Sequence, residues 1–310
     1  MVIDARNLVK RYGTLTALDH LDIGVHEGEV FGLLGPNGSG KTTAINCILS
    51  LLEYDEGTIE VFGTPMTPEN YAAKRDIGIV MQNVAVFQEL TVHENIDYFC
   101  GLYVTDKALR KKLVDEAIAF TGLEDFRKFR PKKLSGGLLR RLNIACGIAH
   151  KPKLIILDEP TVAVDPQSRN KILEGITELN RNGATVVYTS HYMEEVEQIC
   201  TRIMIIDKGR AIATGTKDEL KEMVSIGEKV IVDAEELPDS VMAELRMIDG
   251  VSSSEYVDKV LTVVSERGMS SLEEVLEILK RTGVKYSRIR TELPTLNDVF
   301  LEITGKELRD

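Results

Sequence analysis

The chain has 310 residues, of which 43% are apolar and 28% charged, which is enough for one large or two ordinary folded domains and excludes a disordered or fibrous chain. Its formal net charge of −11 argues against a sequence-independent nucleic-acid partner, because such binding usually requires a basic domain or stripe. No apolar run reaches the ~18–20 residues of a bilayer-spanning helix, and the first residues lack a secretory pattern, so we expect a chain that folds in the cytosol. The four cysteines (Cys47, Cys100, Cys146 and Cys200) form no paired motif and are expected to be buried free thiols.

The first 80 residues alternate short apolar runs with turns. This pattern predicts strands within 2–13, 21–35, 57–63 and 76–82, several with the period-2 alternation of a half-buried sheet. Apolar positions at helical spacing predict a helix within 41–52.

The next 140 residues or so are expected to contain helices separated by buried strands. Continuous apolar runs at 153–160 and 184–190 predict strands, and a hairpin is expected around Lys208 and Gly209. The predicted helices are 91–104, 106–123, 135–150, 166–183 and 191–200. Continuous apolar strands separated by helices favour a parallel sheet covered on both faces.

From about Ser225 the pattern changes to strand, helix, strand, strand, helix, strand, helix. This order predicts a small split-βαβ domain over residues 225–310. Its sequence contains no catalytic constellation.

The segment GPNGSGKTT follows an apolar strand and precedes a helix, the context of a P-loop. Its glycines let successive backbone N–H groups surround phosphates, Lys41 adds a charge for the outer phosphates, and the Thr42 hydroxyl is expected to bind Mg²⁺. The predicted nucleotide-binding residues are Gly35, Pro36, Asn37, Gly38, Ser39, Gly40, Lys41, Thr42 and Thr43.

The segment LIILDEP supplies a second set of groups at the end of a buried strand. Asp158 is placed to hold Mg²⁺ through water. Glu159 is expected to act on the attacking water as general base or orienting group.

In this order and spacing, the P-loop, LSGG (134–137) and LDEP (157–160) resemble the ATP-binding subunit of an ABC transporter. The resemblance covers residues 1 to about 220. It implies an α/β P-loop NTPase fold over 1–224, with a RecA-like core, an antiparallel β subdomain and a helical subdomain at about 84–150. The small C-terminal α+β domain follows, and we expect it to regulate or stabilise a dimer of such subunits.

The resemblance also implies roles for residues outside the two motifs. Gln82 senses Mg²⁺ and the attacking water where the membrane subunit makes contact, and His191 contacts the γ-phosphate. Tyr12 stacks on adenine. The remaining positions are Ser135, Gly136 and Gly137 of the signature segment and Asp165 of the loop that links the two sites.

The family architecture implies ATP and Mg²⁺ as cofactors and two kinds of partner. Two ATPase subunits pack head to tail, with each ATP between the P-loop of one and the signature of the other, and a homodimer is the default on symmetry grounds. A separate integral-membrane permease contacts the chain near Gln82 and the helical subdomain. The chain is then cytoplasmic and peripheral on the inner face of the membrane.

Two sequence features bear on the subfamily. Leu138 stands where the usual signature LSGGQ has glutamine, and we expect the loss of one polar contact to cost on the order of 1 kcal/mol, not the whole site. The tail ELPTLNDVFLEITGKELRD (292–310) resembles drug- and antibiotic-resistance exporters of the daunorubicin or bacitracin type. The alternatives are a soluble ABC-type ATPase without a permease, a non-catalytic ATP-binding switch and the ATPase of an importer.

Overall fold

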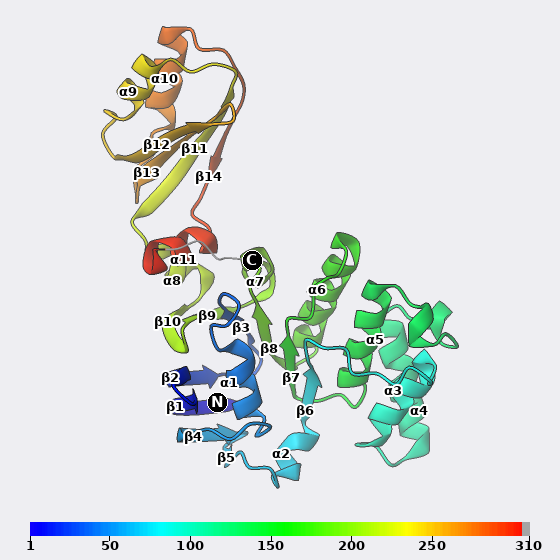
Figure 1. Cartoon of the computed structure of the whole chain (residues 1–310). Coiled ribbons are helices and arrows are strands. Elements are labelled where there is room, and N and C mark those ends of the chain that lie inside the picture. The colour runs from blue at the N-terminus through cyan, green and yellow to red at the C-terminus, as the bar shows by residue number, and fades with distance from the viewer. Residues whose placement is uncertain (306–310) are drawn as a thin grey trace. The chain divides into compact units, whose positions relative to one another are not determined.

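The computed structural model describes residues 1–305, which form two compact units that divide after Thr216 (Figure 1). The first unit contains the P-loop and the LDEP motif. The second begins at Lys217 with the short helix α8 (Lys217–Glu222), which the sequence pattern did not predict. The structural division therefore precedes α8, whereas the predicted boundary followed residue 224. Residues 306–310 of the C-terminal tail lie outside the described residues.

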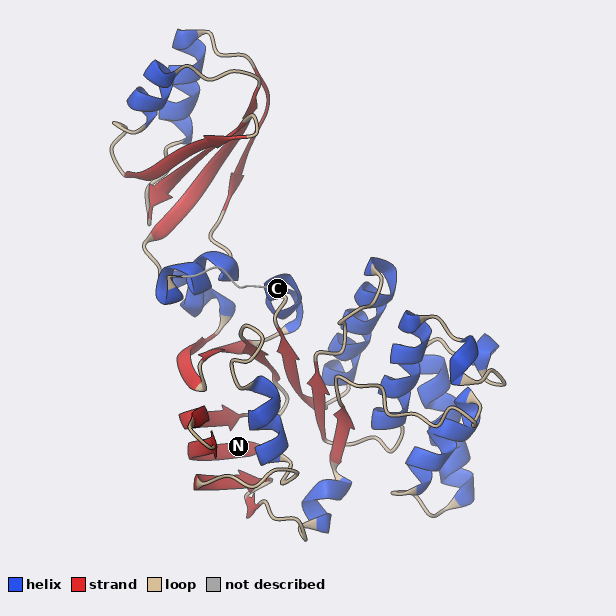
Figure 2. Cartoon of the chain, viewed as in Figure 1, coloured by secondary structure: helices blue, strands red, loops and turns tan. Residues whose placement is uncertain are grey.

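A six-stranded sheet forms the centre of the first unit, and its strands are drawn in red in Figure 2. Their order is β10-β9-β3-β8-β7-β6. All neighbours are parallel except β10, which pairs antiparallel with β9 across the predicted hairpin at Lys208 and Gly209. The strands are β3 (Val30–Leu34), β6 (Ile77–Val80), β7 (Leu154–Asp158), β8 (Thr185–Ser190), β9 (Arg202–Asp207) and β10 (Arg210–Gly215). Because β3, β7 and β8 are buried along their whole length, the prediction of a covered parallel sheet is confirmed.

A second, antiparallel sheet has the order β2-β1-β4-β5. Its strands are β1 (Ile3–Tyr12), β2 (Leu15–Val25), β4 (Glu56–Val61) and β5 (Thr64–Pro65). The apolar stretch 21–35, predicted as strand, holds the end of β2 and all of β3, which belong to different sheets. The chain turns between them at Gly28, whose φ of 75° is in the left-handed region.

Helix α1 (Lys41–Ile48) packs into one apolar core with residues of both sheets. Ile45 of α1, Leu21 of β2 and Ile156 of β7 belong to this core, and all three are fully buried. The other helices that accompany the central sheet are α2 (Tyr71–Arg75), α6 (Pro166–Arg181) and α7 (Met193–Ile199). The P-loop is thus fixed at the start of a helix that two sheets support.

The helical subdomain lies between β6 and β7 in the chain, within the predicted 84–150 region. Its helices are α3 (Val92–Gly101), α4 (Lys107–Phe120) and α5 (Gly136–Ile148), with 3₁₀ turns at 124–126 and 131–133. A capping box formed by Thr91 and Glu94 begins α3, and Asp106 caps α4. The three helices share a core of their own that includes Ile96, Ile118 and Leu142.

The second unit has the strand order β12-β13-β11-β14, with every pair antiparallel. After α8 its elements are β11 (Ile226–Ala234), α9 (Asp239–Leu245), β12 (Val251–Val257), β13 (Val260–Glu266), α10 (Leu272–Thr282), β14 (Tyr286–Glu292) and α11 (Leu296–Thr304). The core brings Val232 and Val263 of the sheet against Leu245 of α9 and Leu279 of α10. This is the split-βαβ arrangement, so the predicted small α+β domain is confirmed.

Two further predictions concern residues spread through the chain. All four cysteines are buried and, in the described range, none forms a disulfide, as expected. Within residues 1–305, no helix combines the length and the apolar character that crossing a membrane would require.

Candidate functional site

The P-loop connects the end of β3 to the start of α1, and its backbone geometry requires glycine at Gly40. That residue caps α1 with a φ of 111°, and a Cβ there would lie 2.8 Å from the carbonyl oxygen of Ala17. The neighbouring Ser39 is 2% exposed, and its hydroxyl has no hydrogen-bond partner in the structure. A buried hydroxyl without a partner at a helix N-terminus fits a loop that receives an anionic ligand.

Lys41 is the first residue of α1, and its side chain turns back over the loop. Its ammonium donates hydrogen bonds to the carbonyls of Gly35 at 2.7 Å and Pro36 at 3.1 Å, and lies 3.4 Å from Glu159 Oε1. Burial lowers the pKa of the Lys41 ammonium, and the charges of Glu159 and Asp158 oppose that shift. The P-loop cation is therefore linked to the carboxylate that follows β7.

Asp158 ends β7 and is fully buried, with both carboxylate oxygens hydrogen-bonded. Thr42 Oγ1 donates to Oδ2 at 3.0 Å, and Thr189 Oγ1 donates to Oδ1 at 2.5 Å. The same Thr189 hydroxyl accepts from the backbone N–H of Glu159 at 3.0 Å. The end of β8 thus fixes both acidic residues of the LDEP motif.

The side chain of Glu159 is the meeting point of three predicted residues. Gln82 Nε2 donates to Oε2 at 3.2 Å, and Lys41 Nζ and His191 Nδ1 each lie 3.4 Å from Oε1. Gln82, Glu159 and His191 follow β6, β7 and β8, three adjacent parallel strands whose carboxyl ends share one edge of the sheet.

The backbone at Glu159 has a φ of 47°, uncommon for a residue with a side chain, and the side chain is almost completely buried. His191 Nδ1 is buried and, despite its 3.4 Å separation from the carboxylate, has no hydrogen-bond partner among residues 1–305. Strained backbone and a polar atom without a partner in one place are typical of a functional site.

We call Lys41, Thr42, Gln82, Asp158, Glu159 and His191 the Glu159 cluster. Of the other predicted residues, Tyr12 lies at the end of β1 with 49% of its surface exposed, and Lys10 Nζ is 5.4 Å from its ring centre. Within residues 1–305, no hydrogen bond or ion pair joins Ser135, Gly136 or Gly137 to the cluster. A single chain therefore brings its P-loop and its LDEP motif together. The signature segment (134–138) lies apart from both.

The signature segment forms the N-terminus of α5. Ser135 is the exposed N-cap, and its Oγ accepts a hydrogen bond from the backbone N–H of Leu138 at 3.3 Å. The Leu138 side chain packs, half-buried, against the apolar core of the helical subdomain. The leucine at this position thus contributes to packing and leaves the helix N-terminus intact.

Gly137 is buried against the start of α6. A Cβ on Gly137 would lie 2.3 Å from Ser168 Oγ and 3.1 Å from Asp165 Oδ2, so only glycine fits here. Asp165 caps α6 by accepting a hydrogen bond from the backbone N–H of Ser168 at 2.9 Å, which lowers the pKa of the Asp165 carboxyl. The signature segment and the predicted cross-site aspartate are therefore neighbours in one chain.

Sequence reasoning gave no role to Thr189 or to Arg140. Thr189 directly precedes Ser190 and His191 at the carboxyl end of a buried strand, and that position on the edge of the sheet could have identified it. Arg140 is the first of two consecutive arginines that follow the signature segment. It is 4% exposed, and its guanidinium donates to five backbone carbonyls of the segments that carry Gln82 and Glu159.

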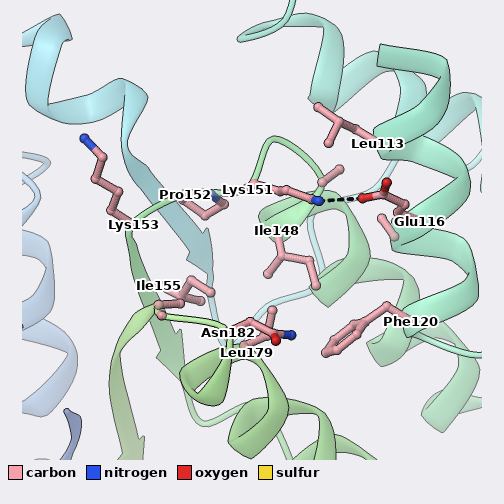
Figure 3. Close-up of a pocket in the computed structure, with 14 residues that line it drawn as sticks. Leu113, Glu116, Phe120, Ile148, Lys151, Pro152, Lys153, Ile155, Leu179 and Asn182 are labelled. Carbon is pink, nitrogen blue, oxygen red and sulfur yellow. Dashed lines mark ion pairs between the residues drawn. The ribbon is translucent and has the colours of Figure 1, made fainter. Parts of the chain in front are cut away.

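A cavity of about 560 Å³ lies elsewhere in the first unit (Figure 3). It is lined by residues of α4, the end of α5, the start of β7 and the end of α6, and Lys151 pairs with Glu116 at its rim at 2.5 Å. The start of β7 is the opposite end of that strand from Asp158, and no predicted site residue lines the cavity.

The residues present fit a magnesium ion held largely by a nucleotide. Within residues 1–305, no group of three or more His, Cys, Asp or Glu side chains could hold a metal ion. The Thr42 hydroxyl and the Asp158 carboxylate nevertheless lie 3.0 Å apart at the mouth of the P-loop. Oxygen ligands of this kind suit Mg²⁺, which usually binds one or two side chains together with phosphates and water.

Comparison with known proteins places this geometry in a family. Residues 18–162 match the family model described as ABC transporter, and residues 215–304 match the C-terminal domain of DrrA1-3-like ATP-binding proteins. The linearmycin resistance ATP-binding protein LnrL of Bacillus subtilis is 37% identical over 100% of both chains. The daunorubicin resistance ATP-binding protein DrrA3 of Streptomyces coeruleorubidus is 35% identical over 97% of this chain and 95% of its own. The Nod factor export ATP-binding protein I of Sinorhizobium fredii is 36% identical over 100% of this chain and 88% of its own.

Solved structures of ATP-binding cassettes also match the chain. The ATP-binding subunit of an ABC transporter aligns with a TM-score of 0.66 at 26% identity, over 72% of this chain and 93% of its own. A dimeric ATP-binding cassette in a post-hydrolysis state, bound to ADP and Pi, aligns with a TM-score of 0.63 at 27% identity, over 69% of this chain and 98% of its own. The predicted ABC ATPase fold is therefore confirmed, and the chain belongs to the ATP-binding subunits of ABC transporters, in the drug-resistance and export group that carries a DrrA-like C-terminal domain.

Proposed function

We propose that this chain binds and hydrolyses ATP to drive an exporter through closure of an ATP-bound dimer on a separate membrane permease. The observation that carries the proposal is the convergence of Lys41, Gln82 and His191 on the carboxylate of Glu159. A carboxylate surrounded by a phosphate-binding cation, an amide and an imidazole is suited to activating water beside a terminal phosphate.

Nucleotide binding is supported by the P-loop. Its backbone N–H groups and Lys41 would bind the phosphates, with the unpartnered hydroxyl of Ser39 available as a further donor. The exposed ring of Tyr12 offers a face on which adenine would stack. Asn37 and Gly38 are exposed, so the outer side of the loop is open to ligand.

Thr42 and Asp158 would hold Mg²⁺, with Gln82 reaching it from the end of β6. When bound, the ion neutralises charge on the β- and γ-phosphates. Thr189 keeps the Asp158 carboxylate in place from the opposite side.

In hydrolysis, Glu159 would accept the proton of the attacking water through Oε1 or Oε2. Gln82 donates to one of these oxygens, and this hydrogen bond fixes the carboxylate plane. His191, whose Nδ1 has no partner in the structure, would donate to the γ-phosphate and orient it toward the water. The buried position of Glu159 keeps other water away from the base.

The signature segment would complete the site of a second subunit. Ser135 Oγ and the N–H groups of Gly136 and Gly137 form a helix N-terminus that, within residues 1–305, has no bond to the Glu159 cluster of its own chain. This separation favours an anion held by another molecule. The contact of Gly137 with Asp165 puts the cross-site loop at the same surface. Two identical copies would then form two equivalent sites.

Exposed apolar side chains between Gln82 and the end of α3 support a permease contact on that part of the surface. Val84 is 37% exposed, Phe87 44% and Tyr98 47%, and the rings of Phe87 and Tyr98 pack edge to face at 4.9 Å. Exposed aromatic residues of this kind are typical of protein interfaces. Through such a contact the chain would lie on the cytoplasmic side of a membrane.

Export is favoured over import by the relatives, which are named for linearmycin resistance, daunorubicin resistance and Nod factor export. The experiment is phosphate release from Mg-ATP by the full chain, compared with Glu159→Gln, together with recovery of an integral-membrane protein by an affinity-tagged chain expressed in its host. Hydrolysis that Glu159→Gln abolishes, with a permease recovered, supports the proposal. Hydrolysis with no membrane partner would favour a soluble ABC-type ATPase, and no hydrolysis a binding switch.

A further inference from the structure

Arg140 lies one helical turn after the start of α5, pointing away from the signature segment into the interior of the first unit. Its Nη1 donates to the carbonyls of Met81 at 3.0 Å and Gln82 at 2.8 Å. Its Nη2 and Nε donate to three successive carbonyls, those of Asp158 at 3.2 Å, Glu159 at 2.7 Å and Pro160 at 2.7 Å.

These five hydrogen bonds use the full donor capacity of a guanidinium, which carries five N–H groups in one plane. The acceptors belong to two loops, the one after β6 that carries Gln82 and the one after β7 that carries Glu159. Burial lowers the pKa of the Arg140 guanidinium, and the Asp158 charge opposes that shift. A buried cation that contacts only backbone fixes the position of that backbone, without touching nucleotide itself.

The neighbouring Arg141 shows that this arrangement is specific to position 140. Arg141 Nη1 donates to the carbonyls of Thr121 and Gly122, after α4 and inside the helical subdomain. Two consecutive arginines on one helix therefore contact different parts of the unit, and only Arg140 reaches the loops of the Glu159 cluster.

We propose that Arg140 is a positioning residue that couples the two nucleotide sites of the dimer. This inference rests on the proposed function. In a head-to-tail dimer, the signature segment of a chain serves the ATP of its partner, whereas Gln82 and Glu159 serve the chain's own ATP. Arg140 joins α5, which begins in the signature segment, to the backbone of both residues. Closure of α5 on one nucleotide thus sets the position of the base at the other.

The test uses the full-length chain and the variants Arg140→Gln, Arg140→Lys and Arg141→Gln. Phosphate release is measured against ATP concentration to give kcat, the half-saturating concentration and the Hill coefficient, whose upper limit for two sites is about 2. Affinity for a fluorescent ATP analogue and the unfolding temperature are measured on the same preparations. Arg141→Gln is the matched control, because it removes from the same helix a guanidinium whose hydrogen bonds go to Thr121 and Gly122 and not to the loops that carry Gln82 and Glu159.

We expect Arg140→Gln to lower kcat on the order of 10–100-fold, as small displacements of catalytic groups do, and to bring the Hill coefficient to about 1. Affinity for the analogue should stay within about threefold, because no nucleotide contact is removed. Arg140→Lys, which supplies three of the five donors, should be intermediate in kcat and Hill coefficient. Arg141→Gln should keep both at wild-type levels.

Unchanged kcat and Hill coefficient in Arg140→Gln would overturn the proposal. So would a fall in kcat that is equal in Arg140→Gln and Arg140→Lys and that parallels a fall in their unfolding temperatures, because the effect would then be one of stability. If Arg140→Gln does not fold, Arg140→Lys decides by the same criteria: an intermediate kcat at unchanged affinity supports coupling, and wild-type values contradict it. If the wild-type chain hydrolyses ATP with a Hill coefficient of about 1, the proposed coupling is contradicted and the proposed ATPase function is not. A wild-type chain that hydrolyses no ATP would instead refute the proposed function.

Discussion

Thr189 Oγ1 donates a 2.5 Å hydrogen bond to Asp158 Oδ1 across the edge of the central sheet. Both residues are fully buried, and the same hydroxyl accepts the backbone N–H of Glu159. The Glu159 turn, with its positive φ, is therefore supported from β8 as well as from the P-loop. This support comes from the protein's own hydrogen bonds and does not depend on a nucleotide.

Thr189→Val keeps the shape of the side chain and removes the hydroxyl. We expect the free energy of unfolding to fall by about 1–3 kcal/mol, because a buried carboxylate oxygen loses its donor. We also expect kcat to fall roughly tenfold through misplacement of Asp158 and Glu159. Urea unfolding and phosphate release measure the two effects. Thr177→Val is the control, since that hydroxyl donates to the carbonyl of Leu173, one turn back on α6, and lies outside the Glu159 cluster. Equal behaviour of the two variants would argue against a special role for Thr189.

Gly137→Ala tests the close approach of the signature segment to α6. The new Cβ would lie 2.3 Å from Ser168 Oγ, so the free energy of unfolding of the nucleotide-free chain should fall by about 1–3 kcal/mol. Gly136→Ala is the matched control for stability, because its nearest neighbouring atom is 3.8 Å away and a change within about 0.5 kcal/mol is expected. Chemical denaturation of both variants distinguishes them, and equal stabilities would mean that α5 and α6 separate at little cost.

Asp298 connects the C-terminal helix α11 to the sheet of the second unit. Its carboxylate accepts from the backbone N–H of Thr295 at 2.8 Å and from the Thr295 hydroxyl, and pairs with Lys229 Nζ on β11 at 2.5 Å. Asp298→Ala should lower the local opening free energy of α11 by about 1–3 kcal/mol. Hydrogen exchange of the α11 amides in the full chain measures this effect. Asp239→Ala, at an exposed first-turn position of α9, should leave α11 protection unchanged.

The same contact gives α11 a dependence on pH. Burial alone would raise the pKa of the Asp298 carboxyl, but the hydrogen bonds from Lys229 and Thr295 outweigh it and lower the pKa below its ordinary value of 3.8. Because the folded pKa is the lower one, this stabilisation is fully present above 3.8 and is lost as pH falls through the folded pKa. Acid should therefore reduce the protection of the α11 amides from hydrogen exchange in the wild type. The same fall in pH should cause no such reduction in Asp298→Asn, which lacks the titrating carboxyl.

Much of the fold could be predicted because its signals are local. The buried strands β7 and β8 are continuous apolar runs, and the P-loop lies between a strand and a helix as its motif requires. The stretch 21–35 was harder, because apolar runs on both sides of the Gly28 turn look alike although they enter different sheets. Helix α8 is short and mostly charged, with Leu220 its one buried residue, so it carries little hydrophobic periodicity.

The residues of the candidate site also fall into those that local motifs predict and those that only the structure reveals. Lys41, Thr42, Asp158 and Glu159 are recognisable from motifs whose spacing is short. The structure brings Lys41 close to Glu159 and Thr42 into a hydrogen bond with Asp158. Arg140 could not be assigned from sequence, because its partners are backbone carbonyls some 20 and 60 positions away. Backbone acceptors have no side-chain signature, so only the three-dimensional structure reveals such a contact.

The central claim is that ATP joins two copies of this chain through the P-loop of one and the signature segment of the other. The most direct measurement is the solution mass of Glu159→Gln by light scattering, with and without Mg-ATP, since this variant should bind ATP without hydrolysing it. The account predicts a monomer of 34.5 kDa that becomes a dimer of twice that mass only with Mg-ATP, and a Glu159→Gln, Ser135→Arg double variant that stays monomeric. A Glu159→Gln chain that binds ATP and remains a monomer would contradict it.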